Sequence, residues 1–196
     1  MLAVELDPRL AAGLRAAGFR VLHADALRVP WPDEPFCVVS SAPFGIGTQL
    51  VRRLLGDAHG LTGATLVLQR ETARRLAGRP RAGRFAASWA PWFHLRVGRR
   101  IPAQAFRPVP AVDAAVLTIA PRTPPLLSPA AFAAYDRFLA RAFTGRGRTL
   151  AERLGRGGAR SLAAVGLPRD ATPSDVPPER YAALFTALSA GSGGAT

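Results

Sequence analysis

The sequence predicts an α/β fold in which a parallel, doubly wound sheet is followed by a small helical part. Short β-rich runs alternate with helical runs over residues 2–119, and only helical runs follow Pro121–Pro125, a linker with three prolines in five residues. Strands that alternate with helices favour parallel pairing through right-handed crossovers. We therefore expect a sheet domain over residues 1–122, a basic helical domain over residues 123–190 and a disordered Gly/Ser-rich tail over residues 191–196.

Each expected strand is a short apolar run bounded by turn residues. The expected strands are Leu2–Leu6, Phe19–His23, Phe36–Ser40, Ala64–Leu68, Trp89–Val97 and Ala114–Ile119. Pro8 opens the first helix and Gly18 ends it, and Thr48 is placed to cap the second helix. The expected helices are Arg9–Ala17, the run from Thr48 through Leu55, Glu71–Ala77, Pro129–Phe143, Thr149–Leu154, Arg160–Val165 and Pro178–Ser189.

The charge of the chain indicates a polyanionic partner. The chain carries 26 basic residues, all of them arginine, against 13 acidic residues, which gives a formal net charge of +13. Much of the excess lies in residues 70–100 and 136–160. Nucleic acid is the favoured partner, because the planar guanidinium of arginine binds two phosphate oxygens at once. A solvated surface on a basic protein is the alternative.

The composition excludes several classes of protein. No apolar run approaches the roughly 18 residues of a membrane helix, and the acidic residues near the start do not fit a signal peptide. Cys37 is the only cysteine, which excludes an internal disulfide, and His23, His59 and His94 are not spaced as metal ligands. We therefore expect a cytoplasmic, monomeric protein that uses neither a metal nor a membrane.

Three polar features follow the first three expected strands. Glu5 closes the first strand, Asp25 follows the second, and Ser41-Ala42-Pro43-Phe44 follows the third. Ligands of doubly wound sheets bind beyond the carboxyl ends of the strands. A carboxylate at the first position can accept from both hydroxyls of a ribose, and one at the second position can accept from an exocyclic amine. Each acid alone is equally typical of a helix cap, so the prediction depends on their order and spacing.

Longer motifs extend this pattern along the whole chain. They are Val4-Glu5-Leu6-Asp7, Asp25-Ala26, the Ser41–Phe44 tetrapeptide followed by Gly45-Ile46, residues 68–76 (LQRETARRL), residues 106–116 (FRPVPAVDAAV), and residues 138–143 leading to Arg148-Thr149-Leu150. With these motifs the chain resembles the ribosomal RNA adenine N6-methyltransferases. Within that family it is most similar to the Erm enzymes, which methylate one adenine of 23S ribosomal RNA and confer macrolide-lincosamide-streptogramin resistance.

The resemblance implies a Rossmann-like S-adenosylmethionine methyltransferase sheet followed by a helical RNA-binding domain. It implies that Glu5 holds the ribose of S-adenosylmethionine and that Leu6 packs on its adenine. Asp25 with Ala26 would bind the amino group of that adenine, and Ser41 would border the cofactor. The arginines that the resemblance places in the RNA-binding surface are Arg74, Arg75, Arg141, Arg146 and Arg148.

The resemblance also assigns the catalytic residues Ser41, Pro43 and Phe44. The Ser41 side chain and the Pro43 carbonyl would accept the N6 hydrogens of the target adenine. Phe44 would stack on the flipped base, and Phe106 would cover its other face. No protein nucleophile is needed, because the methyl group is already carried by a sulfonium. Two acceptors on N6 favour a pyramidal nitrogen whose lone pair faces the methyl group.

Two departures from the family pattern stand out. The family usually has Asn where this chain has Ser41, whose hydroxyl reaches less far, so a reduced rate is expected. The family also begins with a strand and a G-x-G-x-G loop near the methionine part of the cofactor, and the nearest match here, Gly45-Ile46-Gly47, is interpreted as a turn. We therefore expect an N-terminally truncated chain. The missing strand would lie between the strand carrying Glu5 and Phe36–Ser40, leaving two strand edges that close up or stay unpaired.

Three alternatives differ from the Erm interpretation. The RNA substrate could be the 16S ribosomal RNA of the related dimethyladenosine transferases. A catalytically impaired chain could act only as an RNA-binding protein, with arginine contacts from the loops Gly145-Arg146-Gly147 and Gly155-Arg156-Gly157-Gly158. A nicotinamide-dependent enzyme is discounted, because it needs a glycine loop and gives no reason for the Ser41–Phe44 tetrapeptide.

Overall fold

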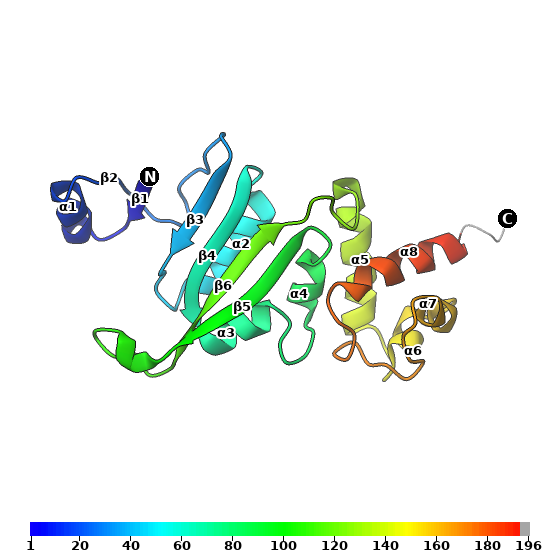
Figure 1. Cartoon of the computed structure of the whole chain (residues 1–196). Coiled ribbons are helices and arrows are strands. Elements are labelled where there is room, and N and C mark those ends of the chain that lie inside the picture. Colours follow the sequence, from blue (N-terminus) through cyan, green and yellow to red (C-terminus); the bar gives the residue numbers. More distant parts are fainter. Residues whose placement is uncertain (193–196) are drawn as a thin grey trace.

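A computed structural model describes residues 1–192 of the chain, and residues 193–196 of the predicted tail lie outside the described residues. Figure 1 shows three parts that follow one another: a small N-terminal unit, a four-stranded sheet with its helices, and a C-terminal group of helices. The mixed α/β fold with a helical C-terminal part confirms the predicted fold class.

The N-terminal unit is a βαβ unit. Its strands β1 (Leu2–Glu5) and β2 (Arg20–His23) pair in parallel, and α1 (Pro8–Ala16) connects them. The Asp7 side chain caps α1 by accepting hydrogen bonds from the backbone N–H groups of Arg9 at 2.7 Å and Leu10 at 3.3 Å. The register of the pair sets Glu5 opposite His23, so both strands end at the same edge.

The larger sheet has the strand order β3-β4-β6-β5. It comprises β3 (Phe36–Ser40), β4 (Leu61–Gln69), β6 (Ala114–Pro121) and β5 (Phe93–Ile101). β3 and β4 are parallel, but β6 runs antiparallel to both of its neighbours, so the expectation of an all-parallel sheet was wrong. The segment between β5 and β6 holds only the short helix η1 (Ala103–Ala105), and a connection without a crossover helix returns the chain antiparallel.

Three helices accompany the larger sheet: α2 (Gly47–Asp57), α3 (Arg70–Leu76) and α4 (Arg84–Trp89). Their apolar faces and the sheet bury one core. Its fully buried leucines are Leu54 on α2, Leu76 on α3, Leu66 and Leu68 on β4, and Leu117 on β6.

Two local expectations in this region were wrong. A strand was expected from Trp89, but Trp89 is the last residue of α4 and β5 begins at Phe93. The helix α4 was not predicted, because its aromatic residues are also typical of a strand. Thr48 does not cap α2, which begins at Gly47 without a side-chain cap; the Thr48 hydroxyl instead accepts a hydrogen bond from Arg75 at 3.3 Å.

The C-terminal part is a group of helices around a second core. It comprises η2 (Pro129–Ala131), α5 (Phe132–Thr144), α6 (Leu150–Leu154), α7 (Gly158–Ala164) and α8 (Arg180–Ser192). Its core includes Tyr135, Leu139, Leu150, Leu154, Leu162, Tyr181 and Leu184. Because α8 continues through Ser192, residues 191 and 192 belong to a helix and not to the predicted tail.

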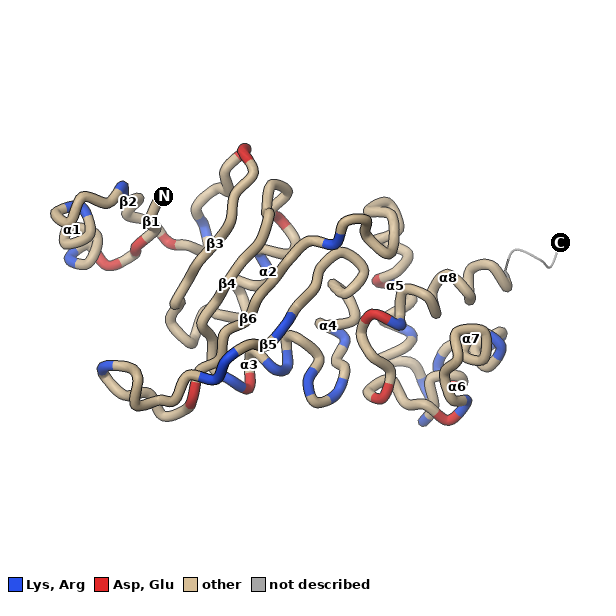
Figure 2. The backbone as a smooth tube through the Cα atoms, viewed as in Figure 1, with Lys and Arg blue, Asp and Glu red and all other residues tan. Residues whose placement is uncertain are grey.

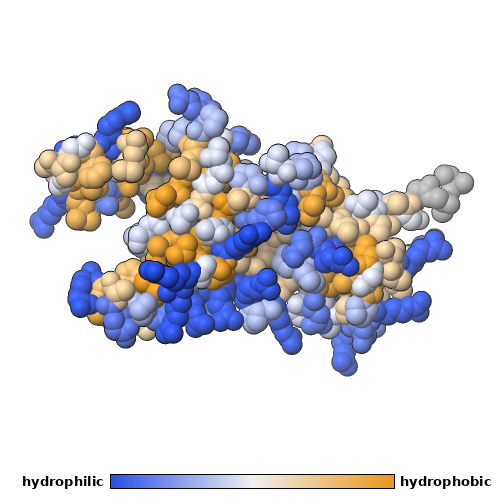
Figure 3. All heavy atoms as spheres, viewed as in Figure 1, coloured by the Kyte–Doolittle hydropathy of each residue, from blue (hydrophilic) through white to orange (hydrophobic). Residues whose placement is uncertain are grey.

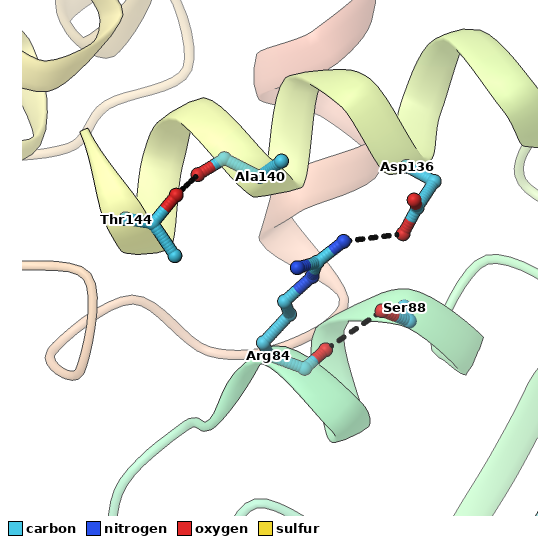
Figure 4. A network of polar contacts seen from close by, with 5 residues as sticks. All are labelled: Arg84, Ser88, Asp136, Ala140 and Thr144. Carbon is cyan, nitrogen blue, oxygen red and sulfur yellow. Dashed lines mark hydrogen bonds and ion pairs between the residues drawn. The ribbon is translucent and has the colours of Figure 1, made fainter.

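Contacts between α4 and α5 join the helical part to the sheet part. The Tyr135 hydroxyl donates to the Ala87 carbonyl at 2.9 Å, and Ala87 belongs to the second core. Close by, Arg84 on α4 pairs with Asp136 on α5 at 2.9 Å (Figure 4). This ion pair is about half exposed, so the buried tyrosine contributes more to the junction.

Within residues 1–192, no strand pairing joins the N-terminal unit to the larger sheet. The two form separate sheets, and β1 and β3 are not hydrogen-bonded neighbours. Apolar side chains on these strands stay in contact with solvent: Val39 on β3 is 84% exposed and Leu2 on β1 is 52% exposed. The edges of β1 and β3 therefore remain unpaired, one of the two outcomes that the sequence analysis allowed.

Candidate active site

The two predicted cofactor acids lie at one edge of the N-terminal unit. The backbone N–H of Ala24 donates to the Glu5 carbonyl at 3.0 Å, so the segment that carries Asp25 crosses the end of β1. The Glu5 carboxylate accepts the N–H of Asp7 at 2.8 Å, and the Asp25 carboxylate accepts the N–H of Leu27 at 2.8 Å. Each acid thus uses one carboxylate oxygen to hold its own turn in place.

The second oxygen of each acid is available for a ligand. That of Glu5 has no hydrogen-bond partner among residues 1–192. That of Asp25 lies 3.5 Å from the Nε of Arg28, whose side chain is 88% exposed, and such a pair is easily displaced. Leu6 exposes its apolar side chain to solvent beside them. Two carboxylate acceptors next to an apolar surface fit the ribose hydroxyls, the amino group and the ring of an adenosine.

The tetrapeptide after β3 forms a tight turn into α2. Ala42 is buried in the core of the larger sheet, whereas Ser41 and Pro43 are exposed. The Pro43 carbonyl accepts the N–H of Ile46 at 3.1 Å. A carbonyl oxygen has two lone pairs, so this one can accept a further hydrogen bond. The Ser41 hydroxyl makes no hydrogen bond within the described part of the chain and is likewise available.

The structure brings Phe44 and Phe106 together from distant parts of the sequence. Their ring centroids lie 6.3 Å apart with an interplanar angle of 73°, an edge-to-face contact. Both rings are partly exposed, so they border solvent rather than fill the core. Partly exposed aromatic rings offer surfaces on which a planar base can stack.

Phe106 lies on the arm between β5 and β6, and Asp113 closes the base of that arm. One oxygen of the Asp113 carboxylate accepts a hydrogen bond from Nε of Arg100 at 2.7 Å, and the other accepts one from the backbone N–H of Ala103 at 3.1 Å. The hydrogen bond from Ala103 and then the one from Arg100 hold the pKa of the Asp113 carboxyl below its usual range. Asp113 therefore fixes both sides of the segment that carries Phe106.

Replacing Asp113 with alanine is expected to loosen the arm, which would show as faster amide hydrogen exchange between β5 and β6. Because the pKa of Asp113 is lowered, the anchor is complete above the usual pKa of about 4 and is lost as the pH falls through the lowered value. Amide hydrogen exchange of the arm is measured in this variant and in the exposed control Asp170→Ala. The same exchange rate of the arm in both variants would contradict this role.

The two halves of the site are separate groups. No hydrogen bond or ring contact within residues 1–192 joins the Glu5–Asp25 pair directly to the Phe44–Phe106 pair. In Figure 1 the loop after β3 lies between the N-terminal unit above and the arm below. Figure 3 shows a hollow on that side of the molecule. The Glu5–Asp25 pair lies in the N-terminal unit, and the Phe44–Phe106 pair lies on the loop after β3 and on the arm.

The predicted RNA-binding arginines differ in whether other residues of the chain hold their side chains. Arg74 lies 4.0 Å from the Glu71 carboxylate, and Arg75 donates to Thr48. Arg141 donates to the carbonyl of Leu154 and thereby joins α5 to α6, which is a structural contact. Arg146 and Arg148 are exposed and can contact phosphates, although the charge of Arg148 also acts on the Glu152 carboxylate.

Sequence analysis missed a group of basic residues around a cavity between the sheet part and the helical part. Figure 2 shows basic residues along β5 and on the loop before α4. A cavity of about 820 Å³ lies between these elements and α8, lined among others by His94, Arg96 and Arg122. Arg122 contacts Nε2 of His94 at 3.2 Å, and burial and then the Arg122 charge lower the pKa of His94. The arginine-rich run 70–100 was the available signal, but it did not single out these residues.

Membrane-spanning and metal-binding features were searched over residues 1–192. None of the helices there is both long and apolar enough to cross a membrane. The same residues contain no group of three or more His, Cys, Asp or Glu side chains placed to hold a metal ion.

The chain is similar to known proteins over nearly its whole length. The family model for ribosomal RNA adenine dimethylase matches residues 1–189. The mycinamicin-resistance protein MyrB of Micromonospora griseorubida is 41% identical over 153 residues, 76% of this chain and 49% of that protein. The rRNA adenine N-6-methyltransferase of Corynebacterium diphtheriae is 38% identical over 160 residues, 80% of this chain and 63% of that protein.

A solved structure supports the same relationship. The crystal structure of the 23S rRNA methyltransferase ErmE superposes on this chain with a TM-score of 0.88 and 33% sequence identity. The match covers 96% of this chain and 81% of the ErmE chain. The matches to the two relatives above span 49% and 63% of the lengths of those proteins. The match of residues 1–189 and the agreement in fold show that the chain belongs to the ribosomal RNA adenine dimethylase family.

Proposed function

We propose that the protein transfers a methyl group from S-adenosylmethionine to N6 of an adenine in 23S ribosomal RNA, the Erm-type reaction linked to macrolide resistance. The observation that carries the proposal is the turn Ser41-Ala42-Pro43-Phe44 at the end of β3, with Phe106 brought against Phe44. The turn offers two hydrogen-bond acceptors and an aromatic ring beside a partly exposed second ring. The names of the similar proteins, among them a 23S rRNA methyltransferase, support this substrate.

The cofactor half of the site consists of Glu5, Leu6 and Asp25, with Ala26 and Ser41 at its border. Glu5 would hold the ribose hydroxyls, and Asp25 would accept from the adenine amino group. Leu6 would pack on the adenine ring. The bound cofactor supplies a methyl group on a sulfonium, which is a good leaving group.

The base half would bind and orient the target adenine. Phe44 would stack on one face of the flipped base and Phe106 would cover the other. The Ser41 hydroxyl and the Pro43 carbonyl would accept the two N6 hydrogens. These acceptors withdraw the nitrogen lone pair from conjugation with the purine, so its alignment with the methyl group improves most in the transition state.

The same proposal assigns the rest of the chain. Residues 1–122 would form the methyltransferase domain and residues 123–190 the basic RNA-binding domain, with Arg146 and Arg148 as its phosphate contacts. The proposal includes a monomeric protein that acts in the cytoplasm, where its ribosomal RNA substrate would be found. Phosphate contacts of this kind make RNA affinity fall steeply with salt concentration.

A methyl-transfer assay with labelled S-adenosylmethionine tests the proposal. The 196-residue chain is incubated with 23S and with 16S ribosomal RNA, and the labelled nucleotide is identified after digestion. We expect label at N6 of adenine in 23S RNA only, and expression of the chain to protect a macrolide-sensitive host. Label in 16S RNA would identify a small-subunit enzyme. Salt-dependent RNA binding without any transfer would identify an RNA-binding protein.

A further inference from the structure

The two halves of the site lie on different sheets, so something other than strand pairing must set the distance between them. The Glu5–Asp25 pair belongs to the β1–β2 sheet, and the turn carrying Phe44 belongs to the β3-β4-β6-β5 sheet. The connection between the two sheets is the loop of residues 24–35, which follows β2 and carries Asp25 as its second residue. How this loop is attached to the larger sheet therefore decides where the cofactor half lies.

Arg53 of α2 makes three contacts with that loop. Its Nη1 donates to the carbonyl of Ala26 at 2.8 Å, and its Nη2 donates to the carbonyl of Val29. Its guanidinium lies over the ring of Trp31, with Cζ 4.2 Å from the ring centroid. One side chain thus holds the loop through two backbone carbonyls and one aromatic face, and the first of these carbonyls directly follows Asp25.

Trp31 extends this attachment to the larger sheet. Its ring stacks on Phe36, the first residue of β3, with centroids 5.6 Å apart. Its indole Nε1 is buried and has no hydrogen-bond partner within residues 1–192. A buried N–H without a partner is costly, so the position of Trp31 is maintained by its ring contacts with Arg53 and Phe36.

α2 is a rigid support for both halves of the site. Val51 and Leu54 are fully buried against the sheet, so the helix cannot shift without opening the core. The helix begins directly after the turn that carries Phe44, and Arg53 lies two turns further, about 10 Å along the axis. The same helix therefore carries the base-binding turn at its start and holds the cofactor loop at Arg53.

We propose that Arg53 is a positioning residue that sets the distance between the bound methyl donor and the target adenine by holding the Asp25 loop against α2. The proposal rests on the proposed function, because it gives Asp25 and Phe44 their roles. Arg53 is assigned no direct ligand contact, because both of its terminal nitrogens and one face of its guanidinium contact the loop. A direct role in binding RNA phosphates is therefore not expected of it.

The test compares Arg53→Ala, Arg53→Lys and Arg52→Ala in the full chain. Arg52 is the matched control, because it neighbours Arg53 on α2 but lies over the Phe85 ring, with Cζ 5.6 Å from its centroid. Four quantities are measured: amide hydrogen exchange of residues 25–31, cofactor affinity with S-adenosylmethionine, RNA affinity, and turnover. Lysine keeps the positive charge but lacks the planar fork that reaches two carbonyls.

For Arg53→Ala we expect faster exchange in residues 25–31 and a turnover about 100-fold lower, with unchanged RNA affinity. Arg53→Lys should recover part of the turnover, and Arg52→Ala should match the wild type in exchange and in turnover. Unchanged exchange, or faster exchange with normal turnover, would overturn the proposal. An equal loss of RNA affinity would also overturn it, because Arg53 would then be an RNA contact.

The failure of the proposed function can be recognised separately. A wild-type chain that transfers no methyl group refutes the proposed function, whereas the exchange comparison between Arg53→Ala and Arg52→Ala still decides whether Arg53 holds the loop. If the exchange of the loop depends on Arg53 while the wild type is inactive, the loop attachment stands and its positioning role is refuted.

Discussion

Replacing Phe44 with alanine is expected to lower turnover about 100-fold while leaving the affinity for S-adenosylmethionine unchanged. Stacking of a base on an aromatic side chain contributes about 1–3 kcal/mol, and a loss near the upper end of this range corresponds to that factor. Cofactor affinity should be preserved, because no hydrogen bond or ring contact within residues 1–192 joins Phe44 to Glu5 or Asp25. Single-turnover kinetics and cofactor titration measure the two quantities independently.

Three further variants test whether the loss of turnover in Phe44→Ala comes from the loss of an aromatic ring that contacts the target base. Phe44→Tyr keeps an aromatic ring and should retain most of the turnover, whereas Phe44→Leu keeps only apolar volume and should resemble the alanine variant. Phe106→Ala combined with Phe44→Ala should lose less than the sum of the two single changes, because the proposed function has both rings contact one base and the rings contact each other. Equal losses of turnover and cofactor affinity in Phe44→Ala would contradict the assignment of this ring to the target base.

Replacing Tyr135 with alanine is expected to reduce the free energy of unfolding by about 3–5 kcal/mol. Tyr135 is 1% exposed, and its ring contacts Trp92, Phe138 and Phe185. Its hydroxyl donates to Ala87 across the junction between α5 and α4, so the change removes core volume and leaves a carbonyl of α4 without this donor. Urea denaturation monitored by tryptophan fluorescence measures the reduction in the free energy of unfolding.

Tyr135→Phe is the matched control for this prediction. It keeps the ring and removes only the hydroxyl, so a smaller loss of about 1–2 kcal/mol is expected. A phenylalanine variant as unstable as the alanine variant would show that the hydrogen bond to Ala87, and not the packing of the ring, stabilises the junction.

The buried phenols also predict an alkaline limit to stability. Burial raises the pKa of Tyr135 and of Tyr181 above the usual value of about 10. Between the usual and the raised pKa the unfolded chain has lost these protons and the native chain keeps them. Stability is therefore complete below about pH 10 and falls as the pH rises through the raised values, and Tyr135→Phe should make the fall shallower.

Most strands and helices were predictable because each depends on a local pattern. The apolar run Phe36–Ser40 was predicted with the bounds that the structure shows. Where the prediction failed, the deciding interaction was not local. The antiparallel direction of β6 depends on how the arm before it turns, and α4 was missed because Phe85 and Trp89 are as typical of a strand as of a short helix.

The candidate site was predictable only in part. The order of Glu5, Asp25 and the Ser41–Phe44 tetrapeptide along the chain identified its residues, and their roles remain predictions. The family resemblance predicted that Phe44 and Phe106 serve one base, but no local pattern encodes their direct ring contact, because that contact depends on how the arm folds. Arg53 and Trp31 carried no signal, since an arginine on a basic helix and a tryptophan between prolines have no distinctive spacing.

The sequence by itself determined the fold class, the family resemblance and the chemical nature of each candidate group, because these depend on residue types and their order. The tertiary structure alone decided the distances between those groups. Arg53 of α2 holds the loop that connects two sheets without a shared strand, and two rings from distant segments meet in one contact. Such contacts depend on how a loop and an arm pack on elements far away in the chain, and no local pattern of residues encodes that packing.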